Sequence, residues 1–371
     1  MRSRATLAIF SSVSPWPVSS SGGSVSEGTL FSLWYTRGVE PLDLTWLGEA
    51  DVEGVALTDE EILAAVEFGL LAQAAGETVI EPRVHLEPGP ALKGHFNVLR
   101  AYVAPLGLAG VKVVGDYVEN FRRGLPSELG LLCLFDASTG APVAVLAAAA
   151  ITEMRTGALT ALGARHLARR DARVLGHVGA RGTAYWNVRL LDHLFDFAEI
   201  RIHSRRPESR EAFADRLSTE LGKPVISAES WEECLRGADV MVEASRLERP
   251  EPHLRTDWIE PGCLVVPYGT MSAVELSLTD VMDKVVVDDW GQARAGTFGA
   301  LRAHVDSGRL SEETLYAELC EIVAGKRPGR ESDEERILFW HRGLSSSDVA
   351  LGHAVLERAR SLGLGHQLRV L

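Results

Sequence analysis

Three basic residues have types and surroundings that suit the binding of an anionic ligand. Lys112 interrupts the apolar segment 110–114, where a lysine costs free energy unless it is paired or faces a functional site. Exposure on an edge strand is the alternative explanation for Lys112. Arg155 lies near the start of a predicted helix, where helix-end N–H groups and a guanidinium together suit a carboxylate, although an ordinary surface arginine is the alternative. Arg83, taken alone, is the weakest of the three signals.

A glycine turn lies between an apolar run and an amphipathic segment. Residues 174–178 form the apolar run, Gly179-Ala180-Arg181-Gly182-Thr183-Ala184 forms the turn, and residues 186–197 form the amphipathic segment. The order strand, turn, helix lets the backbone approach a pyrophosphate closely, with the N–H groups of a helix N-terminus directed at it. The pattern therefore predicts dinucleotide binding, and a purely structural turn is the alternative.

The turn departs from the usual G-x-G-x-x-G spacing. Arg181 stands where a second glycine is common, and Gly176-x-x-Gly179-x-x-Gly182 is the other way to align the glycines. Arg181 either crowds the pyrophosphate or contacts it as a cation. From this turn we assign Gly176, Gly179, Arg181, Gly182 and Thr183 to the dinucleotide.

The end of the next predicted strand indicates which dinucleotide is bound. NAD-selective sites usually have Asp or Glu about 20 residues beyond the glycines, bonded to the ribose hydroxyls. Here the strand ends in His203-Ser204-Arg205-Arg206, and two guanidiniums and a hydroxyl suit a 2′-phosphate. We therefore favour NADP(H), with NAD(H) as the alternative because a solvated arginine pair would look the same. Ala244 and Ser245, at the end of a later predicted strand, are assigned to the same cofactor.

Composition and charge narrow the class of protein. The net charge of −13 argues against broad nucleic-acid binding, which needs basic surface. The four cysteines have neither CxxC nor metal-type spacing, so we expect reduced thiols in a cytoplasmic protein and no metal site. No run approaches the ~18 apolar residues of a membrane-spanning helix. Residues 1–27 are Ser-rich, without the apolar length or cleavage site of a targeting peptide, and we expect a disordered tail or an over-long translation start.

The first half of the chain reads as a helix followed by strands. Thr58-Asp59-Glu60-Glu61 matches a capping box, with apolar residues at helical spacing behind it and Gly76 as a stop. Strand-like segments at 78–86, 97–103, 110–114 and 130–135 are separated by short turns. This part of the chain predicts a mainly antiparallel sheet.

The second half alternates strands and helices. A long helix is expected at 151–168, followed by strands at 173–178, 199–203, 225–227, 240–244, 263–267 and 284–288, with helices at 208–221 and 231–236. This alternation predicts an α/β fold with a doubly wound parallel sheet. A further helix is expected at 311–324, a strand-like run at 336–341 and a final helix at 347–362. The final helix has no strand partner in the alternating block, which favours packing back onto the first domain.

A set of motifs in a fixed order resembles the ornithine cyclodeaminase/mu-crystallin family from about Leu30 to the C-terminus. The motifs are Arg83, Gly110-x-Lys112-x-Val114, Asn120, Gly124-Leu125-Pro126, Phe135-Asp136-x-x-x-Gly140, Met154-Arg155-Thr156-Gly157-Ala158, Arg165-x-Leu167-Ala168, Ala238-Asp239-Val240, Pro261-Gly262, Glu275-Leu276, Val286-Val287-Asp288-Asp289 and Gly343-Leu344-x-x-x-Asp348. Each motif is modest, and their order and spacing together are specific.

The resemblance implies a homodimer with a Rossmann domain and an α+β substrate-binding and dimerisation domain built from both chain ends. We place the outer domain at 28–150 and 330–371 and the Rossmann domain at 151–329. The resemblance also implies that Arg83, Lys112 and Arg155 hold the substrate carboxylate beside the nicotinamide, and we take Lys112 as the catalytic acid/base. Family members include ornithine cyclodeaminases, alanine dehydrogenases and ketimine reductases, which share hydride transfer at a carbon that bears nitrogen.

Two local features bear on the substrate. Cyclodeaminases of the family carry an acid/base aspartate six residues before the Glu-Leu pair, and that position here is Gly269. The usual cyclodeamination route is therefore disfavoured, since Tyr268 and Thr270 are not ready bases at neutral pH. Asp116 and Asn120 are assigned to the substrate, because carboxylates in 116–123 and at Glu128 would suit a second cationic group. A solvated charged loop is the alternative.

These observations lead to one main prediction and two alternatives. We predict a cytoplasmic NAD(P)(H)-dependent oxidoreductase that acts at the α-carbon–nitrogen bond of a small amino or imino acid. A redox-neutral cyclodeaminase is one alternative, and a binder of dinucleotide or small ligand with little catalysis is the other. We expect no nucleic-acid or membrane partner.

Overall fold

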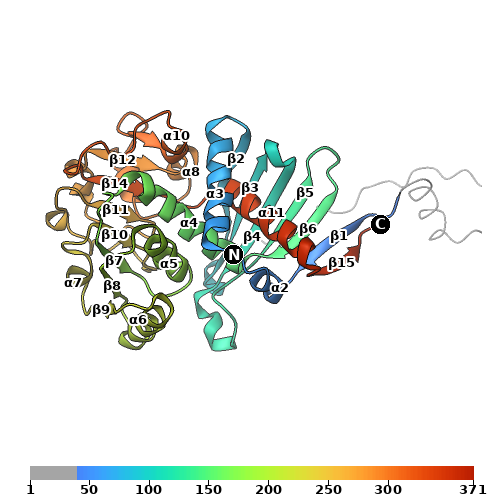
Figure 1. The fold of residues 1–371 in the computed structure, drawn as a ribbon, viewed down its shortest axis with the longest axis horizontal. Helices are drawn as coiled ribbons and strands as arrows, with labels where there is room; N and C mark the ends of the chain where they lie inside the picture. Colours follow the sequence, from blue (N-terminus) through green and yellow to red (C-terminus); the bar gives the residue numbers. More distant parts are fainter. Residues whose placement is uncertain (1–39) are drawn as a thin grey trace, which may run out of the picture. The chain divides into compact units, whose positions relative to one another are not determined.

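The computed structural model describes residues 40–371, of which residues 43–370 form one compact unit. The predicted tail at 1–27 and the first part of the predicted outer domain, 28–39, lie outside the described residues. The compact unit contains one sheet of seven strands and one of eight (Figure 1). This architecture confirms the predicted α/β class.

The seven-stranded sheet has the order β15-β1-β6-β5-β4-β3-β2. Its strands are β1 (Asp43–Leu47), β2 (Thr78–Leu86), β3 (His95–Val103), β4 (Leu108–Asp116), β5 (Glu128–Asp136), β6 (Pro142–Ala147) and β15 (His366–Arg369). β2 to β6 pair antiparallel in sequence order, which confirms the predicted meander, whereas β1 pairs parallel to β6. The sequence analysis did not find β1, β6 or β15.

Two helices from opposite ends of the chain pack side by side on this sheet. The helix α3 (Asp59–Ala74) starts at the predicted capping box, in which the backbone N–H of Thr58 and that of Glu61 each bond the other residue's side chain. The helix α11 (Ser345–Leu362) packs against α3, β3 and β4, as the unpartnered final helix predicted (Figure 1). A short helix, α2 (Glu49–Gly54), lies near β1 and β6.

The eight-stranded sheet is parallel throughout, in the order β13-β12-β14-β11-β10-β7-β8-β9. Its strands are β7 (Val174–Val178), β8 (Glu199–His203), β9 (Val225–Ser227), β10 (Val240–Glu243), β11 (Leu264–Pro267), β12 (Lys284–Val287), β13 (Ala317–Glu318) and β14 (Ile337–Trp340). The six strands predicted between 173 and 288 are all present. The strand order reverses between β7 and β10, which is the topological switch point of a doubly wound sheet.

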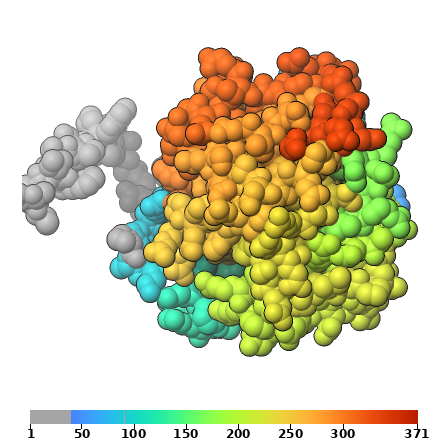
Figure 2. Space-filling view, turned by 90° about the vertical axis from the view of Figure 1, so that its left-hand side faces the viewer, coloured from blue at the N-terminus to red at the C-terminus, as the bar shows by residue number. Residues whose placement is uncertain are grey.

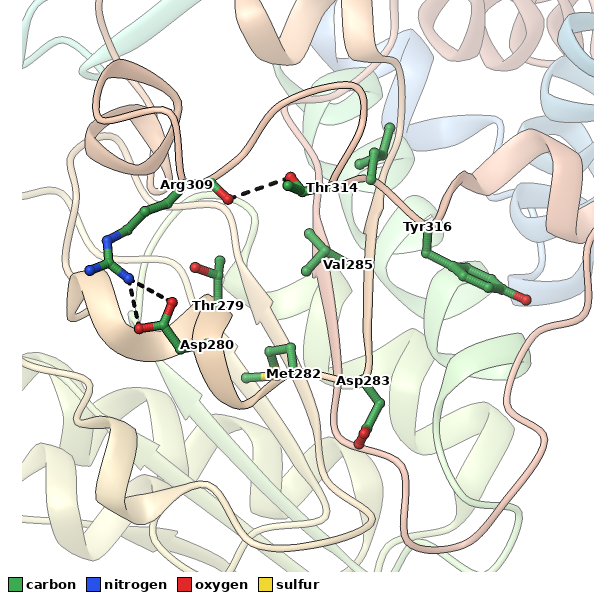
Figure 3. Close-up of a pocket in the computed structure, with 9 residues that line it drawn as sticks. Thr279, Asp280, Met282, Asp283, Val285, Arg309, Thr314 and Tyr316 are labelled. Carbon is green, nitrogen blue, oxygen red and sulfur yellow. Dashed lines mark hydrogen bonds and ion pairs between the residues drawn. The ribbon is translucent and has the colours of Figure 1, made fainter.

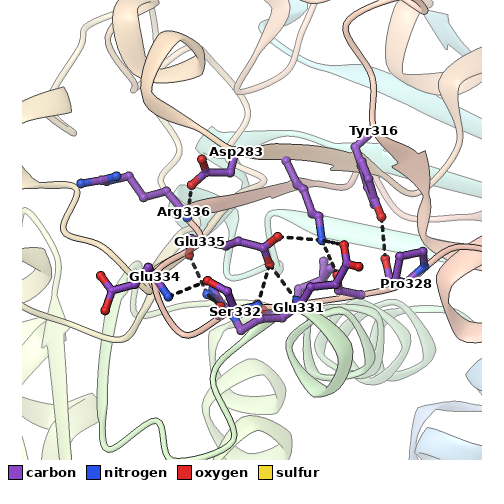
Figure 4. A network of polar contacts seen from close by, with 12 residues as sticks. Asp283, Tyr316, Pro328, Glu331, Ser332, Glu334, Glu335 and Arg336 are labelled. Atoms are coloured by element: carbon purple, nitrogen blue, oxygen red, sulfur yellow. Dashed lines mark hydrogen bonds and ion pairs between the residues drawn. The ribbon is translucent and has the colours of Figure 1, made fainter.

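The position of β14 corrects the predicted boundary at 330. The strand inserts between β11 and β12 instead of following the outer domain. All four residues of β14 are apolar and buried, and the buried Lys284 ammonium binds the loop before the strand through Glu331 at 2.8 Å and Glu335 at 2.9 Å. Figure 4 shows this network and the neighbouring bond from the Arg336 backbone N–H to Asp283 at 2.7 Å. The sheet therefore continues to Trp340, while the division into two domains stays a prediction.

The predicted helix at 311–324 is confirmed only at 319–323 and is wrong before that. The structure has the strand β13 followed by a short helix, α10 (Leu319–Val323), in its place. The backbone N–H of Tyr316 bonds the carbonyl of Val285 at 2.8 Å, and Ala317 pairs with Val286. Pairing with the edge of the parallel sheet thus overrides the helical spacing of the apolar residues in this segment.

A long helix, α4 (Ala149–Leu167), connects the two sheets and is buried along most of its length. It packs against α3 and α11 on one side and against α5 (Ala184–Phe195), β11 and β14 on the other. Gly157 allows the closest approach, since a Cβ there would lie 2.5 Å from the Trp186 carbonyl carbon of α5. The helix thereby places side chains from its first turns between the sheets.

The remaining helices lie beside the eight-stranded sheet. They are α6 (Pro207–Leu221), α7 (Trp231–Leu235), α8 (Trp290–Arg294) and α9 (Arg302–Asp306). Figure 2 views the protein from this side, where segments coloured green to orange form the surface. Among residues 40–371, no helix has the length and apolar character needed to span a membrane.

Candidate active site

A buried carboxylate joins two of the three predicted basic residues. Lys112, on β4, is 1% exposed, and its Nζ lies 2.5 Å from Oδ1 of Asp348 on α11. Nε of Arg155, on α4, donates to the same Oδ1 at 2.8 Å, and Nζ of Lys112 also donates to Oγ1 of Thr152 at 2.9 Å. β4 lies in the interior of the seven-stranded sheet, so the edge-strand explanation of Lys112 is wrong.

The local sequence explains why these side chains converge. Alternate residues of β4 face α11, and a Cβ on Gly110 would collide with Val349 of that helix, so Lys112 two residues later faces α11 as well. Asp348 lies in the first turn of α11, where the helix dipole favours a negative charge. Gly343 has a φ of +80°, and a Cβ there would overlap the Arg155 guanidinium. The glycine before α11 therefore leaves room for Arg155 to reach the carboxylate.

Burial strongly affects the pKa values of the ionisable groups in this cluster. Burial, with the nearby Arg155, lowers the pKa of Lys112 to about 7, although Asp348 acts in the opposite direction. Burial disfavours ionisation of Asp348, but Arg155 and Lys112 outweigh it and lower the pKa of that carboxyl group. Burial, followed by Arg342 and Arg155, lowers the pKa of Arg83 to about 9. A group with pKa near 7 in a buried cationic cluster suits proton transfer at neutral pH.

The cluster has spare hydrogen-bonding capacity, with a donor on Arg83 and an acceptor on Asp348. Arg83 belongs to its electrostatic surroundings and donates from Nη2 to the Arg342 carbonyl at 2.5 Å. Within residues 40–371, Nε of Arg83, Oγ of Ser347 and Oδ2 of Asp348 are buried without a hydrogen-bond partner. Buried polar groups are normally paired, so these atoms indicate where ligand groups or water would bind. The structure thus brings Arg83, Lys112 and Arg155 together.

Asp116 and Asn120 do not join this cluster. Asp116 forms an ion pair with Arg246, from the loop after β10, and Arg246 also lies 3.4 Å from Glu128. Nδ2 of Asn120 donates to the Pro126 carbonyl at 3.0 Å and closes its own loop. The carboxylates that were expected to select a cationic substrate group are therefore already paired within the chain.

The glycine turn has the donor set expected for a pyrophosphate. Gly179 has a φ of +120°, and a Cβ there would lie 2.9 Å from the Ala244 carbonyl oxygen. In the part of the chain that the structure describes, the backbone N–H groups of Arg181, Gly182 and Thr183 have no backbone or side-chain acceptor before α5 begins. Free N–H groups at a helix N-terminus fit an anionic phosphate. Gly176 lies inside β7 against Cys234, so close packing accounts for that glycine.

Three arginines gather near the carboxyl end of β8. Nη2 of Arg181 donates to Oγ of Ser209 on α6 at 3.3 Å, which directs Arg181 toward the start of that helix. Arg206 precedes α6, and Ser204 bonds its carbonyl at 3.4 Å. Arg205 lines a hollow of about 300 Å³ whose other residues come from the loop after β10: Leu247, Glu248, Arg249 and Glu251. The three arginines place positive charge at this end of the strand, and the hollow also contains the carboxyl groups of Glu248 and Glu251.

A row of contacts connects the glycine turn with the basic cluster. The Tyr268 hydroxyl lies 2.8 Å from Oγ1 of Thr183, and the Tyr268 ring stacks on His341 with centroids 4.7 Å apart. Nε2 of His341 lies 2.9 Å from Oγ1 of Thr160 on α4, the helix that also carries Arg155. Burial, with the nearby Arg155, lowers the pKa of His341 to about 3, so this ring is neutral. The dinucleotide turn and the cationic cluster therefore adjoin.

Two carboxyl groups of the site were not found from the sequence as site residues. Asp348 stood in the last motif, but an acidic residue in a first helical turn is usually a solvated one. Glu243 ends β10, and its carboxyl group occupies the space next to Gly269. A carboxyl group directly after an apolar strand was the available signal for Glu243.

A second hollow lies elsewhere and is not part of this site. It has about 410 Å³ and is lined by Thr279, Asp280, Met282, Asp283, Val285, Arg309, Thr314, Leu315 and Tyr316 (Figure 3). These residues lie around the amino ends of β12 and β13, whereas ligands of open α/β sheets bind at the carboxyl ends. Arg309 and Asp280 form an ion pair at 2.6 Å beside it.

Comparison with known proteins identifies relatives in sequence and in fold. A sequence profile of the ornithine cyclodeaminase/mu-crystallin family matches residues 45–363. Alanine dehydrogenase from Archaeoglobus fulgidus is 31% identical over 327 residues, which are 87% of this chain and 97% of that protein. The structure of an archaeal alanine dehydrogenase dimer with bound NAD is similar, with a TM-score of 0.81 and 29% identity, covering 89% of this chain and 100% of that one. Thermococcus litoralis Δ1-pyrroline-2-carboxylate reductase in complex with NADH and L-proline has a TM-score of 0.81 and 27% identity, covering 88% and 100%.

Asp348→Asn tests whether the shared carboxylate holds the site together. We expect the free energy of unfolding to fall by about 3 kcal/mol at pH 7, because Lys112 and Arg155 would remain buried without their common counter-charge. Urea denaturation measures this change. Asp280→Asn makes the same substitution in the exposed pair with Arg309 and should cost no more than about 1 kcal/mol. Equal losses in the two variants would contradict the role given to Asp348.

Proposed function

The chain belongs to the ornithine cyclodeaminase/mu-crystallin family, and we propose that it is an NAD(P)(H)-dependent oxidoreductase acting at the α-carbon–nitrogen bond of a small amino or imino acid. The observation that carries the proposal is the buried cluster of Lys112, Arg155 and Asp348 adjoining a glycine turn with free N–H groups. The similar alanine dehydrogenase and pyrroline-2-carboxylate reductase support the same reaction class.

In this proposal the basic cluster binds the substrate carboxylate. Arg83 and Arg155 supply guanidinium donors, and Asp348 limits the positive charge that the buried cluster holds before substrate enters. Lys112 exchanges a proton with the substrate nitrogen through Nζ, since its pKa of about 7 permits both protonation states at neutral pH. A bound nicotinamide supplies or accepts the hydride at the α-carbon. Tyr268 and His341 close the space between the two half-sites and exclude water from it.

A redox-neutral cyclodeaminase has less support from the site. No side chain at Gly269 reaches the substrate, and the neighbouring Glu243 carboxyl group bonds the backbone N–H groups of Ser245 and Gly269. Both of its oxygens are thus directed at the protein backbone. Reversible amino/imino acid redox requires less from this position than amine deamination followed by cyclisation.

NADP(H) is the cofactor that we propose. Arg181, Arg205 and Arg206 lie near the carboxyl end of β8, and the strand carries no carboxylate at its tip. A 2′-phosphate is recognised by such cations, whereas NAD is usually held by an acidic residue there. The similar solved structures contain NAD or NADH, so the preference for NADP(H) is a feature proposed for this chain.

We further propose that the protein forms a homodimer through the uncovered face of the seven-stranded sheet. α3 and α11 cover one face, so alternate residues of β4 and β5 point away from them. Val113, Leu129 and Leu131 on that second face are 39%, 43% and 42% exposed. A contiguous exposed apolar surface is typical of a protein interface, and the similar alanine dehydrogenase is a dimer.

A cofactor-linked absorbance screen tests the proposed reaction. Purified protein is incubated with NADPH or NADH and cyclic or linear imino acids, and with the oxidised cofactors and neutral or basic amino acids. We expect net consumption of the reduced cofactor with an imine, because the proposed reaction is not redox-neutral. Product analysis accompanies each assay. Ammonia and a cyclic amino acid formed without net cofactor change would indicate a cyclodeaminase, and cofactor binding without any turnover would indicate a binder.

Lys112→Met tests the proton-transfer role within this reaction. Removing a general acid/base is expected to lower turnover by at least about 100-fold. Cofactor affinity, measured separately by titration, should stay within about threefold of wild type because the glycine turn is intact. Lys93→Met, at an exposed lysine paired with Glu119, is the matched control and should leave turnover unchanged. Turnover within a few-fold of wild type in the Lys112 variant would refute the assignment.

Arg205→Ala combined with Arg206→Ala tests the cofactor preference. Loss of charge-assisted bonds to a 2′-phosphate should weaken NADPH binding by about 20-fold, while NADH binding changes by less than about threefold. Calorimetric titration of both cofactors measures the difference. Arg358→Ala, at an exposed arginine of α11, controls for the general effect of reduced positive charge. A similar loss for both cofactors would show that the arginines do not read the 2′-phosphate.

A further inference from the structure

Glu243 is a buried carboxyl group that the proposed reaction does not use. It is the last residue of β10 and has no exposed surface. Its Oε1 accepts the backbone N–H of Ser245 at 2.7 Å, and its Oε2 accepts that of Gly269 at 3.2 Å. A Cβ on Gly269 would lie 2.6 Å from each carboxyl oxygen, so no larger residue fits at 269 while the carboxyl group stays there. The packing thus fixes the group between the loops that follow β10 and β11.

No cation within residues 40–371 balances this group. Its hydrogen bonds come from neutral backbone donors, and no lysine, arginine or histidine in the described chain forms an ion pair with it. Burial raises the pKa of Glu243 to about 7, against the opposing effect of the Ser245 and Gly269 N–H groups. A buried carboxylate without a counter-charge is costly, so a ligand that supplies positive charge nearby would be bound more tightly.

The topology places Glu243 at the carboxyl end of a strand that flanks the switch point of the sheet. β10 and β7 flank the switch point, and Glu243 pairs in register with Val178, the last residue before the glycine turn. In a doubly wound sheet the adenosine half of a dinucleotide lies over the first three strands and the other half over the strands beyond the switch point. The first three here are β7, β8 and β9, so β10 and β11 face the nicotinamide half.

We propose that Glu243 is the buried counter-charge of the oxidised nicotinamide ring and makes the preference between oxidised and reduced cofactor depend on pH. The ionised carboxylate attracts the cationic ring of NAD(P)⁺, whereas the protonated form is neutral toward it. The ring of NAD(P)H carries no charge and responds little to either form. Binding of the oxidised cofactor to the protonated enzyme therefore releases the Glu243 proton to solvent. The proposal concerns the cofactor alone and does not depend on which substrate the enzyme reduces.

The titration of Glu243 must be distinguished from the titration of other groups around it. Burial raises the pKa of Tyr268, and burial lowers the pKa of His177 on β7 to about 4, so both are neutral near pH 7. Burial also brings the pKa of Lys112 and the pKa of Glu153 on α4 to about 7. Lys112 and Glu153 therefore titrate in the same range as Glu243.

Calorimetric titration of oxidised and reduced cofactor between pH 5.5 and 8.5 tests the proposal. The measured quantity is the ratio of the two dissociation constants within the NAD pair and within the NADP pair. Titration of the 2′-phosphate near pH 6 cancels within the NADP pair, because both forms carry that phosphate. In wild type, affinity for the oxidised form should rise about tenfold relative to the reduced form as pH increases through 7. At pH 7, titrations in two buffers of different ionisation enthalpy should show proton release only with the oxidised form.

Glu243→Gln keeps the size of the side chain and removes its charge. We expect the ratio to become independent of pH and the proton release to disappear, while affinity for the reduced form stays within about threefold. Glu243→Asp keeps the charge and should retain the pH dependence, which separates the charge effect from a general disturbance of the loop. Glu153→Gln is the matched control, because it removes another carboxyl group with a raised pKa and should leave the dependence intact.

Lys112→Met resolves the remaining ambiguity, since loss of a lysine proton would have the same sign as loss of the Glu243 proton. The pH dependence should persist in Lys112→Met and vanish when Glu243→Gln is added. A wild-type ratio that does not change with pH would overturn the proposal. So would a dependence that survives Glu243→Gln but is abolished by Lys112→Met or Glu153→Gln.

Discussion

The structure depends on a single carboxylate oxygen shared by two buried cations. Oδ1 of Asp348 bonds Lys112 from the middle of one sheet and Arg155 from the helix that leads to the other. Ion pairs of this kind gain little net stability over apolar packing, because three charges must be taken out of water. Their geometric effect is large, since β4, α4 and α11 must be in register for the bonds to form. The bonds thus join a helix near the C-terminus, α11, to a strand and a helix from the middle of the chain.

The candidate active site lies where α4 connects the two sheets. α4 carries Arg155 toward the seven-stranded sheet, and Thr160 of the same helix contacts His341 beyond β14. His341 and Tyr268 continue the row to Thr183 at the glycine turn. The helix α4 therefore fixes the distance between the cationic cluster and the glycine turn. Because α4 packs closely along both its sides, neither half-site can shift without disturbing the helix core.

The features visible in the sequence are those with a local physical signature. A lysine in an apolar strand and a glycine turn between strand and helix identified Lys112 and Gly179, and alternation of apolar segments identified most strands of both sheets. The predictions that failed concern segments whose structure is determined by tertiary contacts. Residues 311–324 have helical spacing, but Ala317 and Glu318 pair with β12, and β14 enters the parallel sheet between β11 and β12. The substrate role expected for Asp116 stays a prediction, and the structure places Arg246, distant in sequence, beside it.

Asp348 and Glu243 show why the carboxyl groups of this site were harder to interpret than its cations. Both are buried, yet neighbouring cations lower the pKa of Asp348, whereas burial without a cation raises that of Glu243. The first is therefore a permanent charge that organises the chain, and the second is a group whose charge can change within the physiological range. Residue type and spacing do not distinguish these two environments, because the distinction depends on which distant side chains complete each one. Gly269 illustrates this directly, because the Glu243 carboxyl group fills the space that a side chain at position 269 would occupy.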